Sequence, residues 1–172
     1  MKNSLKYVFF LFIVIVIVFF SLGFFIPVIS FQNKVLVNKP IDLSFETFTD
    51  VSKMKDWFAG FKNIEWLSGF PGEIGNQWAL TVVQNGKEYI MIQTITGFKV
   101  NELFAFHLEN KILDSDVQIY FSSKNNITEI TVDNKIEGKN IYWKSLFVFT
   151  QLYFKNKQQE NYERLKQVIE SN

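Results

Sequence analysis

The sequence has no cysteine, one histidine and only three prolines among its 172 residues. The absence of cysteine excludes disulfide bonds, thiolate catalysis and cysteine-ligated metal sites in this chain. Lysine and arginine total 18, aspartate and glutamate total 17, and the net charge is +1. Proteins that bind nucleic acid need a basic excess to neutralise phosphates. The composition therefore predicts no thiol chemistry and no nucleic-acid partner.

The residues needed for a catalytic or metal site are also scarce. His107 lies on the opposite strand face from Phe104 and Phe106, so we interpret it as an exposed side chain rather than a general base. Asp114 and Asp116 are one residue apart, but they lack the glycine and distal glutamate of a calcium loop. The sequence contains no nucleophile elbow, phosphate-binding loop or dinucleotide fingerprint. We predict no catalytic residue, no metal site and no cofactor.

The most informative stretch present is apolar and lies near the N-terminus. No charged residue occurs between Lys6 and Lys34. A helix of about 20 apolar residues crosses a hydrocarbon core roughly 30 Å thick, so we predict one transmembrane helix over residues 7–29. A cleaved signal peptide is the alternative, but its apolar region is about 7 to 15 residues long and ends in small residues. The bulky exit from Phe24 to Phe31 favours an uncleaved anchor.

The charges that flank this span predict its orientation. Lys2 and Lys6 precede it with no acidic residue between them, and positive flanks tend to stay cytoplasmic. We therefore predict a cytoplasmic N-terminus, residues 1–6, and a soluble domain, residues 33–172, outside the cytoplasm. Lys34 and Lys39 on the far side reduce this charge asymmetry. A short hinge at residues 30–34 is expected to hold the domain close to the membrane.

The spacing of apolar residues in the soluble part changes twice, from helical to strand-like and back to helical. A short strand at residues 34–38 precedes two short amphipathic helices, one opened by Pro40 and one capped by Asp50. Residues 141–170 are again helical, and the first half of that helix is apolar over much of its circumference. We expect that half to be deeply buried, to line a cavity or to rest against lipid. Between the helices, period-two alternation predicts strands at 61–67, 77–83, 88–96, 103–108, 116–122 and 127–136.

This order of elements resembles the START-like superfamily, also called SRPBCC or polyketide cyclase-like. The likeness extends to single positions in the opening strand and paired helices, and in the strands that follow. These positions are Val35 to Asn38, Pro40, Phe45, Phe48, Asp50, Trp57, Gly75 before the strand of Trp78, and the Asn85-Gly86 hairpin. The proline common in a later turn of the family is absent from Asn101-Glu102-Leu103. The resemblance covers residues 33–170.

The resemblance implies an α+β helix-grip fold, in which a curved antiparallel sheet wraps around the long C-terminal helix. In this family an apolar cavity lies between sheet and helix. We assign the alternating apolar residues of the strands to its concave side, although alternation alone leaves the direction of Tyr89 and Met91 open. An ordinary solid core is the alternative. The candidate cavity residues are Trp57, Trp66, Phe70, Trp78, Leu80, Tyr89, Met91, Phe104, Phe106, Ile119, Phe121, Ile130, Val132, Trp143 and Phe147.

By the same resemblance, the loop at residues 68–75 lies near the cavity mouth, where Phe70 would act as a lid. The alternative is a turn-rich connection whose phenylalanine closes the core. The implied function is non-enzymatic binding of a hydrophobic small molecule or lipid beside a membrane. One alternative is a polyketide cyclase or aromatase-like enzyme that uses Tyr89 or Tyr120. The other is an interaction module with a filled core whose long helix docks on a protein partner.

Overall fold

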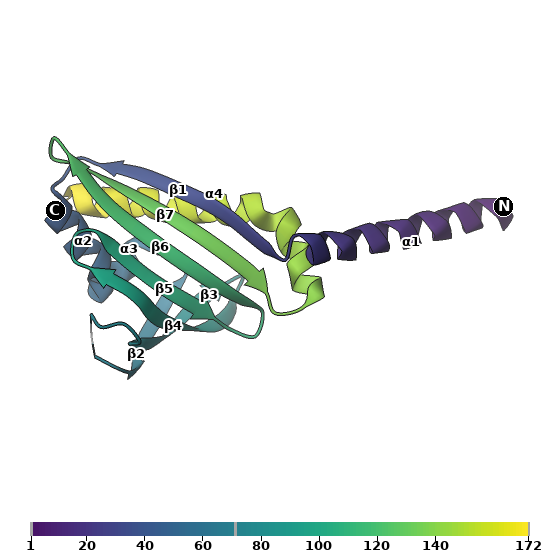
Figure 1. Cartoon of the computed structure of the whole chain (residues 1–172), viewed down its shortest axis with the longest axis horizontal. Coiled ribbons are helices and arrows are strands. Elements are labelled where there is room, and N and C mark those ends of the chain that lie inside the picture. The colour runs from purple at the N-terminus through teal and green to yellow at the C-terminus, as the bar shows by residue number, and fades with distance from the viewer. Residues whose placement is uncertain (1, 71, 172) are drawn as a thin grey trace.

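The computed structural model describes residues 2–70 and 72–171, and Figure 1 shows its elements. Residue 1, whose amino group adds to the N-terminal charge, and Pro71 of the proposed lid loop lie outside this description. Helix α1 (Lys2–Phe25) projects from a body that contains one sheet and the long helix α4 (Ile141–Ser171). Three short helical segments follow the first strand: α2 (Ile41–Thr49), the 3-10 turn η1 (Val51–Lys53) and α3 (Met54–Trp57).

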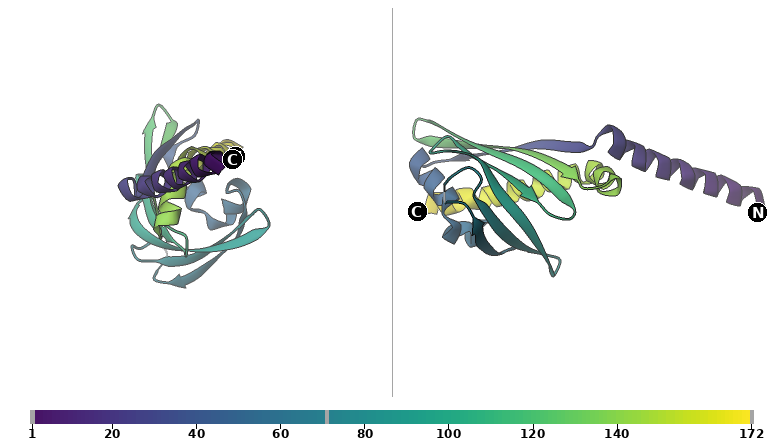
Figure 2. Two further views of the ribbon diagram at one scale, coloured as in Figure 1. Left: turned by 90° about the vertical axis from the view of Figure 1, so that its right-hand side faces the viewer. Right: turned by 60° about the horizontal axis from the view of Figure 1, so that its bottom comes forward.

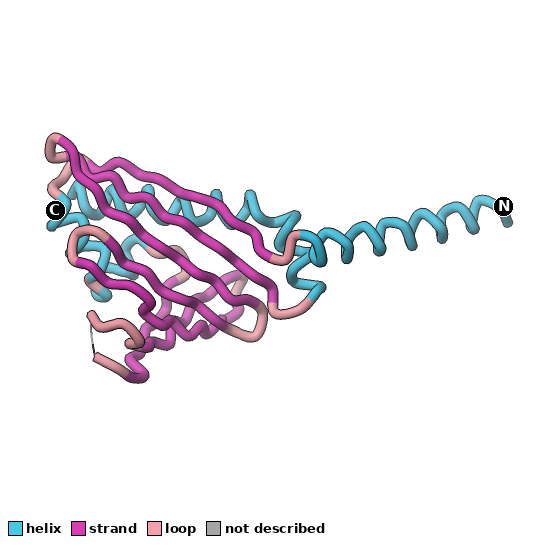
Figure 3. The backbone as a smooth tube through the Cα atoms, viewed as in Figure 1, coloured by secondary structure: helices cyan, strands magenta, loops and turns pink. Residues whose placement is uncertain are grey.

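The sheet has seven strands in the order β1-β7-β6-β5-β4-β3-β2. Each neighbouring pair is antiparallel, so β2 to β7 form a meander and β1 lies beside the last strand. Figure 3 shows the strands as one magenta layer, and Figure 2 shows this layer curving around the helices. The strands are β1 (Val28–Val37), β2 (Phe61–Ser68), β3 (Gln77–Gln84), β4 (Lys87–Lys99), β5 (Leu103–Glu109), β6 (Leu113–Lys124) and β7 (Ile127–Gly138).

The first strand begins earlier than the sequence predicted. It pairs with β7 along its whole length, from Val28 opposite Glu137 to Val37 opposite Thr128. The predicted hinge at residues 30–34 is therefore wrong, because those residues lie inside β1. Only Ile26 and Pro27 separate the end of α1 from the start of the strand. The sheet is thus joined to the apolar helix by a very short connection.

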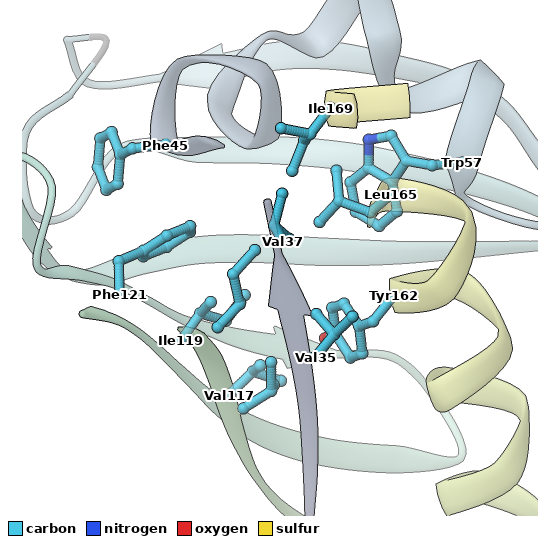
Figure 4. Packing of buried hydrophobic residues seen from close by; sticks show 12 residues of the cluster. Val35, Val37, Phe45, Trp57, Val117, Ile119, Phe121, Tyr162, Leu165 and Ile169 are labelled. Carbon is cyan, nitrogen blue, oxygen red and sulfur yellow. The ribbon is translucent and has the colours of Figure 1, made fainter. Parts of the chain in front are cut away.

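The main hydrophobic core lies under the second half of α4. Leu165 and Ile169 have no exposed surface and face the inner side of β1, β6 and β7. Figure 4 shows their side chains beside Trp57 and near Val37. Burial of this kind is worth about 25 cal/mol for each Å² of apolar surface removed from water. This core holds the C-terminal half of α4 against the sheet.

A second cluster lies under the first half of α4 and contains Ile29, Phe31, Ile136 and Phe147. The main cluster includes residues of β1, β6 and β7, the second cluster residues of β1 and β7, and α4 contacts β1 and β7 most. The helix therefore covers one side of the curved sheet, and strands β2 to β5 extend beyond it.

The last turns of α1 pack against the start of α4. Gly23 is buried there, and a Cβ atom at this position would lie 2.3 Å from Ser145 Oγ. The ring of Phe19 stacks on Phe149 with centroids 5.9 Å apart, and it lies 6.1 Å from the ring of Tyr142. Residues Leu5–Phe25 of α1 are long and apolar enough to cross a membrane, and almost none of them is buried.

Candidate ligand-binding face

The strand register assigns the candidate residues to one face of the sheet. Leu80 of β3 lies opposite Met91 of β4, Val82 lies opposite Tyr89, and directly paired residues point to the same side. A register shift between Ile95 and Gly97 of β4 returns Phe98 to the side of the sheet on which Ile95 lies, and there it pairs with Phe104. Tyr89 and Met91 therefore face inward with Leu80, which resolves the orientation that alternation left open.

The same register continues across the sheet to the strands that α4 covers. Phe104 pairs with Ile119 and Phe106 pairs with Val117, while Ile119 pairs with Val132. The candidate residues on β3 to β7 thus share one continuous inner face. Figure 4 shows Val117, Ile119 and Phe121 on this face, directed toward the helices.

Burial divides this inner face into two parts. On β6 and β7, Ile119, Phe121, Ile130 and Val132 are buried in the main core. On β3 to β5, Trp78, Tyr89, Met91, Phe104 and Phe106 are only half-buried, and Leu80 is the buried exception among the candidates. Trp78, Tyr89 and Met91 belong to neither of the two packed clusters of the described residues. We call the inner surface of β3 to β5, formed by Trp78, Leu80, Tyr89, Met91, Phe104 and Phe106, the open face.

Three other candidates lie away from the open face. Trp57 is buried in the main core with its ring centroid 5.7 Å from that of Phe48. Trp143 and Phe147 belong to the second cluster, under the first half of α4. These three residues brace the fold around the open face rather than line it.

Trp66 of β2 pairs with Trp78 and therefore points to the same inner side, at the edge of the sheet. Its side chain is exposed there, and its Nε1 donates to the backbone oxygen of Gly69 at 3.2 Å.

The lid loop leaves its phenylalanine in solvent. Phe70 is 71% exposed, so the interpretation in which this ring closes the core is wrong. Gly69 and Gly75 have φ angles of 83° and 91°, a backbone conformation that glycine adopts without steric cost. Ile74 in the same loop is equally exposed. The loop therefore presents two apolar side chains beside β2 and β3, and its role as a lid stays a prediction.

Two hydrogen bonds connect α4 to the chain at one end of the open face. Asn161 Oδ1 accepts from the backbone N–H of Ala59 at 3.1 Å. Gln84 Nε2 donates to the hydroxyl of Tyr153 at 3.3 Å. Ala59 precedes β2, whose first residue Phe61 pairs with Val82 near the end of β3, so both bonds lie at the β3–β4 hairpin end of the open face.

Buried amide groups interrupt the apolar inner face, and the alternation of the strands did not predict them. Asn33 and Asn134 are almost fully buried on β1 and β7. Asn33 Nδ2 donates to the backbone oxygen of Lys155 and to Gln159 Oε1, both at 3.0 Å. The Oδ1 atoms of both asparagines have no hydrogen-bond partner among the described residues. Since buried polar groups are usually paired, each oxygen can accept from a water molecule or from a polar group of a ligand.

The convex face carries the polar cluster of the sheet. His107 Nδ1 lies 2.7 Å from Asp116 Oδ1, and Asp114 and Glu109 are close enough to form a possible set of metal ligands with it. His107 is half-buried rather than fully exposed, but it points away from the open face as predicted. The Asp114 carboxylate accepts a hydrogen bond from Lys139 and thereby raises the pKa of that ammonium group.

The positions of the tyrosines test which of them can be a catalytic residue. Tyr120 is exposed on the convex face, where its hydroxyl donates to Gln118 Oε1 at 2.8 Å, so a catalytic role for it inside the grip is excluded. Tyr89 lies on the open face. Tyr162 lies in the main core, and burial raises the pKa of its hydroxyl, which therefore stays neutral.

Comparisons with known proteins support the fold. No family model and no curated protein matches the sequence. Among solved structures, Ara h 8.0201 superposes with a TM-score of 0.68 at 18% identity over 84% of this chain and 99% of its own. The Zhui aromatase/cyclase from Streptomyces sp. R1128 gives 0.68 at 13% identity, over 83% and 94%. A protein of unknown function from Staphylococcus aureus gives 0.66 at 16%, over 84% and 94%.

These likenesses, together with the observed sheet order and the long C-terminal helix, confirm the predicted α+β helix-grip fold. Identities this low carry information about the fold only, since one fold hosts many functions. The function is therefore inferred from the residues of this chain.

Proposed function

We propose that this protein binds a hydrophobic small molecule or lipid on its open face while α1 anchors it in a membrane. The observation that supports this proposal is the contrast across one inner face. The inner residues of β6 and β7 are buried under α2 and α4, whereas Trp78, Met91 and Phe106 keep accessible apolar surface. Each Å² of that surface covered by an apolar ligand contributes about 25 cal/mol. The likeness to a fold that includes an aromatase/cyclase is consistent with a ligand-binding face in this position.

The membrane part of the proposal rests on α1. Residues Leu5–Phe25 meet the length and composition of a membrane span. In the proposed topology Lys2 and Lys6 stay on the cytoplasmic side and the sheet lies on the other side, since positive flanks favour the cytoplasm. The connection of two residues between α1 and β1 then holds the domain at the membrane surface. A ligand that dissolves in lipid is concentrated at that surface.

Two alternatives have support in particular observations. The enzyme alternative keeps Tyr89, which lies on the open face opposite Val82 of β3. The interaction-module alternative is supported by the exposed apolar residues on the first half of α4. The following experiment separates the interaction module from ligand binding.

Photolabelling in lipid nanodiscs tests the proposal. The full chain is reconstituted with a phospholipid that carries a photoreactive group at the end of one acyl chain, and labelled residues are mapped by mass spectrometry. We expect label on β3 to β5 of the open face as well as on α1. Met91→Lys should reduce the label on the open face about tenfold, because an ammonium group there must lose water when the acyl chain binds.

Ile90→Lys is the matched control, since Ile90 is the next residue of β4 and points to the convex side with 62% exposure. It should leave labelling of the open face unchanged. Label confined to α1 and α4 in the wild-type protein would contradict ligand binding on the open face. That result would favour the interaction module.

A further inference from the structure

The first half of α4 exposes a second apolar surface, which the ligand-binding proposal does not use. Phe149 and Leu152 are 60% and 67% exposed, and they are the largest contributors. On the same side of the helix, the residues after Tyr153 become polar, beginning with Asn156 and Gln159. We call this surface the α4 patch, and its members are Ile141, Tyr142, Phe149, Leu152 and Tyr153.

The α4 patch is continuous with the apolar surface of α1. The two helices touch where Gly23 meets Ser145, and small residues at such a contact allow close backbone approach. Phe19 of α1 stacks on Phe149 of the patch. An apolar groove also runs between the helices, with Ile141 on one side and Phe20 and Phe24 on the other. Figure 2 shows α1 leaving the body at the end where α4 begins.

We propose that the α4 patch lies in the interfacial layer of the same lipid bilayer that α1 spans. This inference rests on the proposed membrane anchoring of α1. Phe20 and Phe24 of α1 line the same groove as Ile141 of α4, so the three side chains share one environment. For a membrane-spanning helix, that environment is lipid. Tyrosines are favoured where an apolar layer meets polar headgroups, and Tyr142 and Tyr153 stand in the patch.

The change from apolar to polar exposed side chains along α4 determines how far the helix enters the interface. Up to Tyr153 the exposed side chains are apolar, and Lys155 and Lys157 follow within four residues. Interfacial helices bury an apolar face about 5 to 10 Å into the headgroup and acyl boundary, and lysines next to it keep their ammonium groups in the headgroup layer. The border of the patch therefore lies at Tyr153.

This placement gives the open face a direct route to lipid. The hydroxyl of Tyr153 accepts from Gln84 at the end of β3, so the β3–β4 hairpin lies beside the border of the patch. With the patch in the interface, the hairpin end of the open face meets the bilayer surface. A lipid can then move from the bilayer to Met91 and Tyr89, near the start of β4, with little exposure of its acyl chain to water.

The lack of cysteine permits a direct test, since every introduced cysteine is the only thiol in the chain. Leu152→Cys and Ile141→Cys report on the α4 patch, and Gln167→Cys is a matched control on an exposed polar position of the same helix. Phe12→Cys reports on α1. Each full-length variant is labelled with an environment-sensitive fluorophore in phospholipid nanodiscs, with quenchers placed either near the headgroups or deep in the acyl chains.

The proposal predicts that the headgroup-level quencher acts several-fold more strongly on the labels at residues 152 and 141 than on the label at 167. It also predicts that the deep quencher acts on the label at residue 12. Patch labels as insensitive as the one at 167, with residue 12 quenched, would overturn the inference and leave the anchor standing. A label at residue 12 that neither quencher reaches would overturn the anchor and this inference together.

Discussion

Leu165→Ala is expected to lower the free energy of unfolding by about 3 to 5 kcal/mol, the range for a leucine removed from a core that cannot collapse. Leu165 has no exposed surface and lies beside Trp57 of α3 and near Tyr162 and Ile169 of its own helix (Figure 4). The cavity left behind would be lined by α3, the sheet and α4, and these cannot all move inward together. Denaturant unfolding of the full chain in a mild detergent, followed by tryptophan fluorescence, measures the change.

Ile74→Ala is the control, because it removes an aliphatic side chain of similar size from a position that is 71% exposed. Its free energy of unfolding should stay within about 0.5 kcal/mol of the wild-type value, as for most surface substitutions. If the two variants lose equal stability, the packing described for the second half of α4 is wrong.

Gly138→Ala is expected to lower the free energy of unfolding by about 2 kcal/mol through overpacking. An added Cβ would lie 2.4 Å from the backbone nitrogen of Lys144 and 2.6 Å from the carbonyl carbon of Trp143. Both atoms belong to the first turn of α4, so the start of the helix must move away from the end of β7. Because the α4 patch begins at this turn, the variant should also shift the fluorescence of Trp143.

Gly97→Ala provides a comparison within the sheet. There the added Cβ would lie 3.2 Å from Ala105 Cβ and 3.3 Å from Leu103 Cδ2, which are side-chain atoms able to adjust. The loss of stability should be smaller than for Gly138→Ala. If Gly97→Ala loses as much stability as Gly138→Ala or more, the close contact of α4 with Gly138 does not explain the sensitivity of position 138.

The order of elements was predictable because each change in the spacing of apolar residues indicates a change between helix and strand. Alternation between residues 61 and 136 needs a sheet with one buried face, and helical spacing after Gly138 needs one long helix. The start of β1 was missed because Val28, Ile29 and Phe31 continue the apolar run of α1 without a charged residue. Only pairing with β7, a contact between distant parts of the chain, identifies them as strand residues.

The candidate site was predictable only as a face. Alternation selected Trp78, Phe104 and Phe106, but which inner residues are sealed depends on where α4 lies across the sheet. The orientation of Tyr89 depends on the register with β3. Asn33 could have been suspected, since it is a polar residue at an inward position of an alternating strand. Trp143 and Phe147 were assigned to the cavity because helical spacing does not show which part of a sheet a helix covers.

Ligand binding on the open face is tested by native mass spectrometry of the full chain, purified in a mild detergent from membranes of its own type of host. Bound species are then extracted and identified. Our account predicts a defined apolar species on the wild-type protein and on Ile90→Ala, and its loss from Trp78→Ala and Phe106→Ala. A wild-type protein that carries no such species, or one retained equally by all four proteins, would contradict ligand binding on the open face.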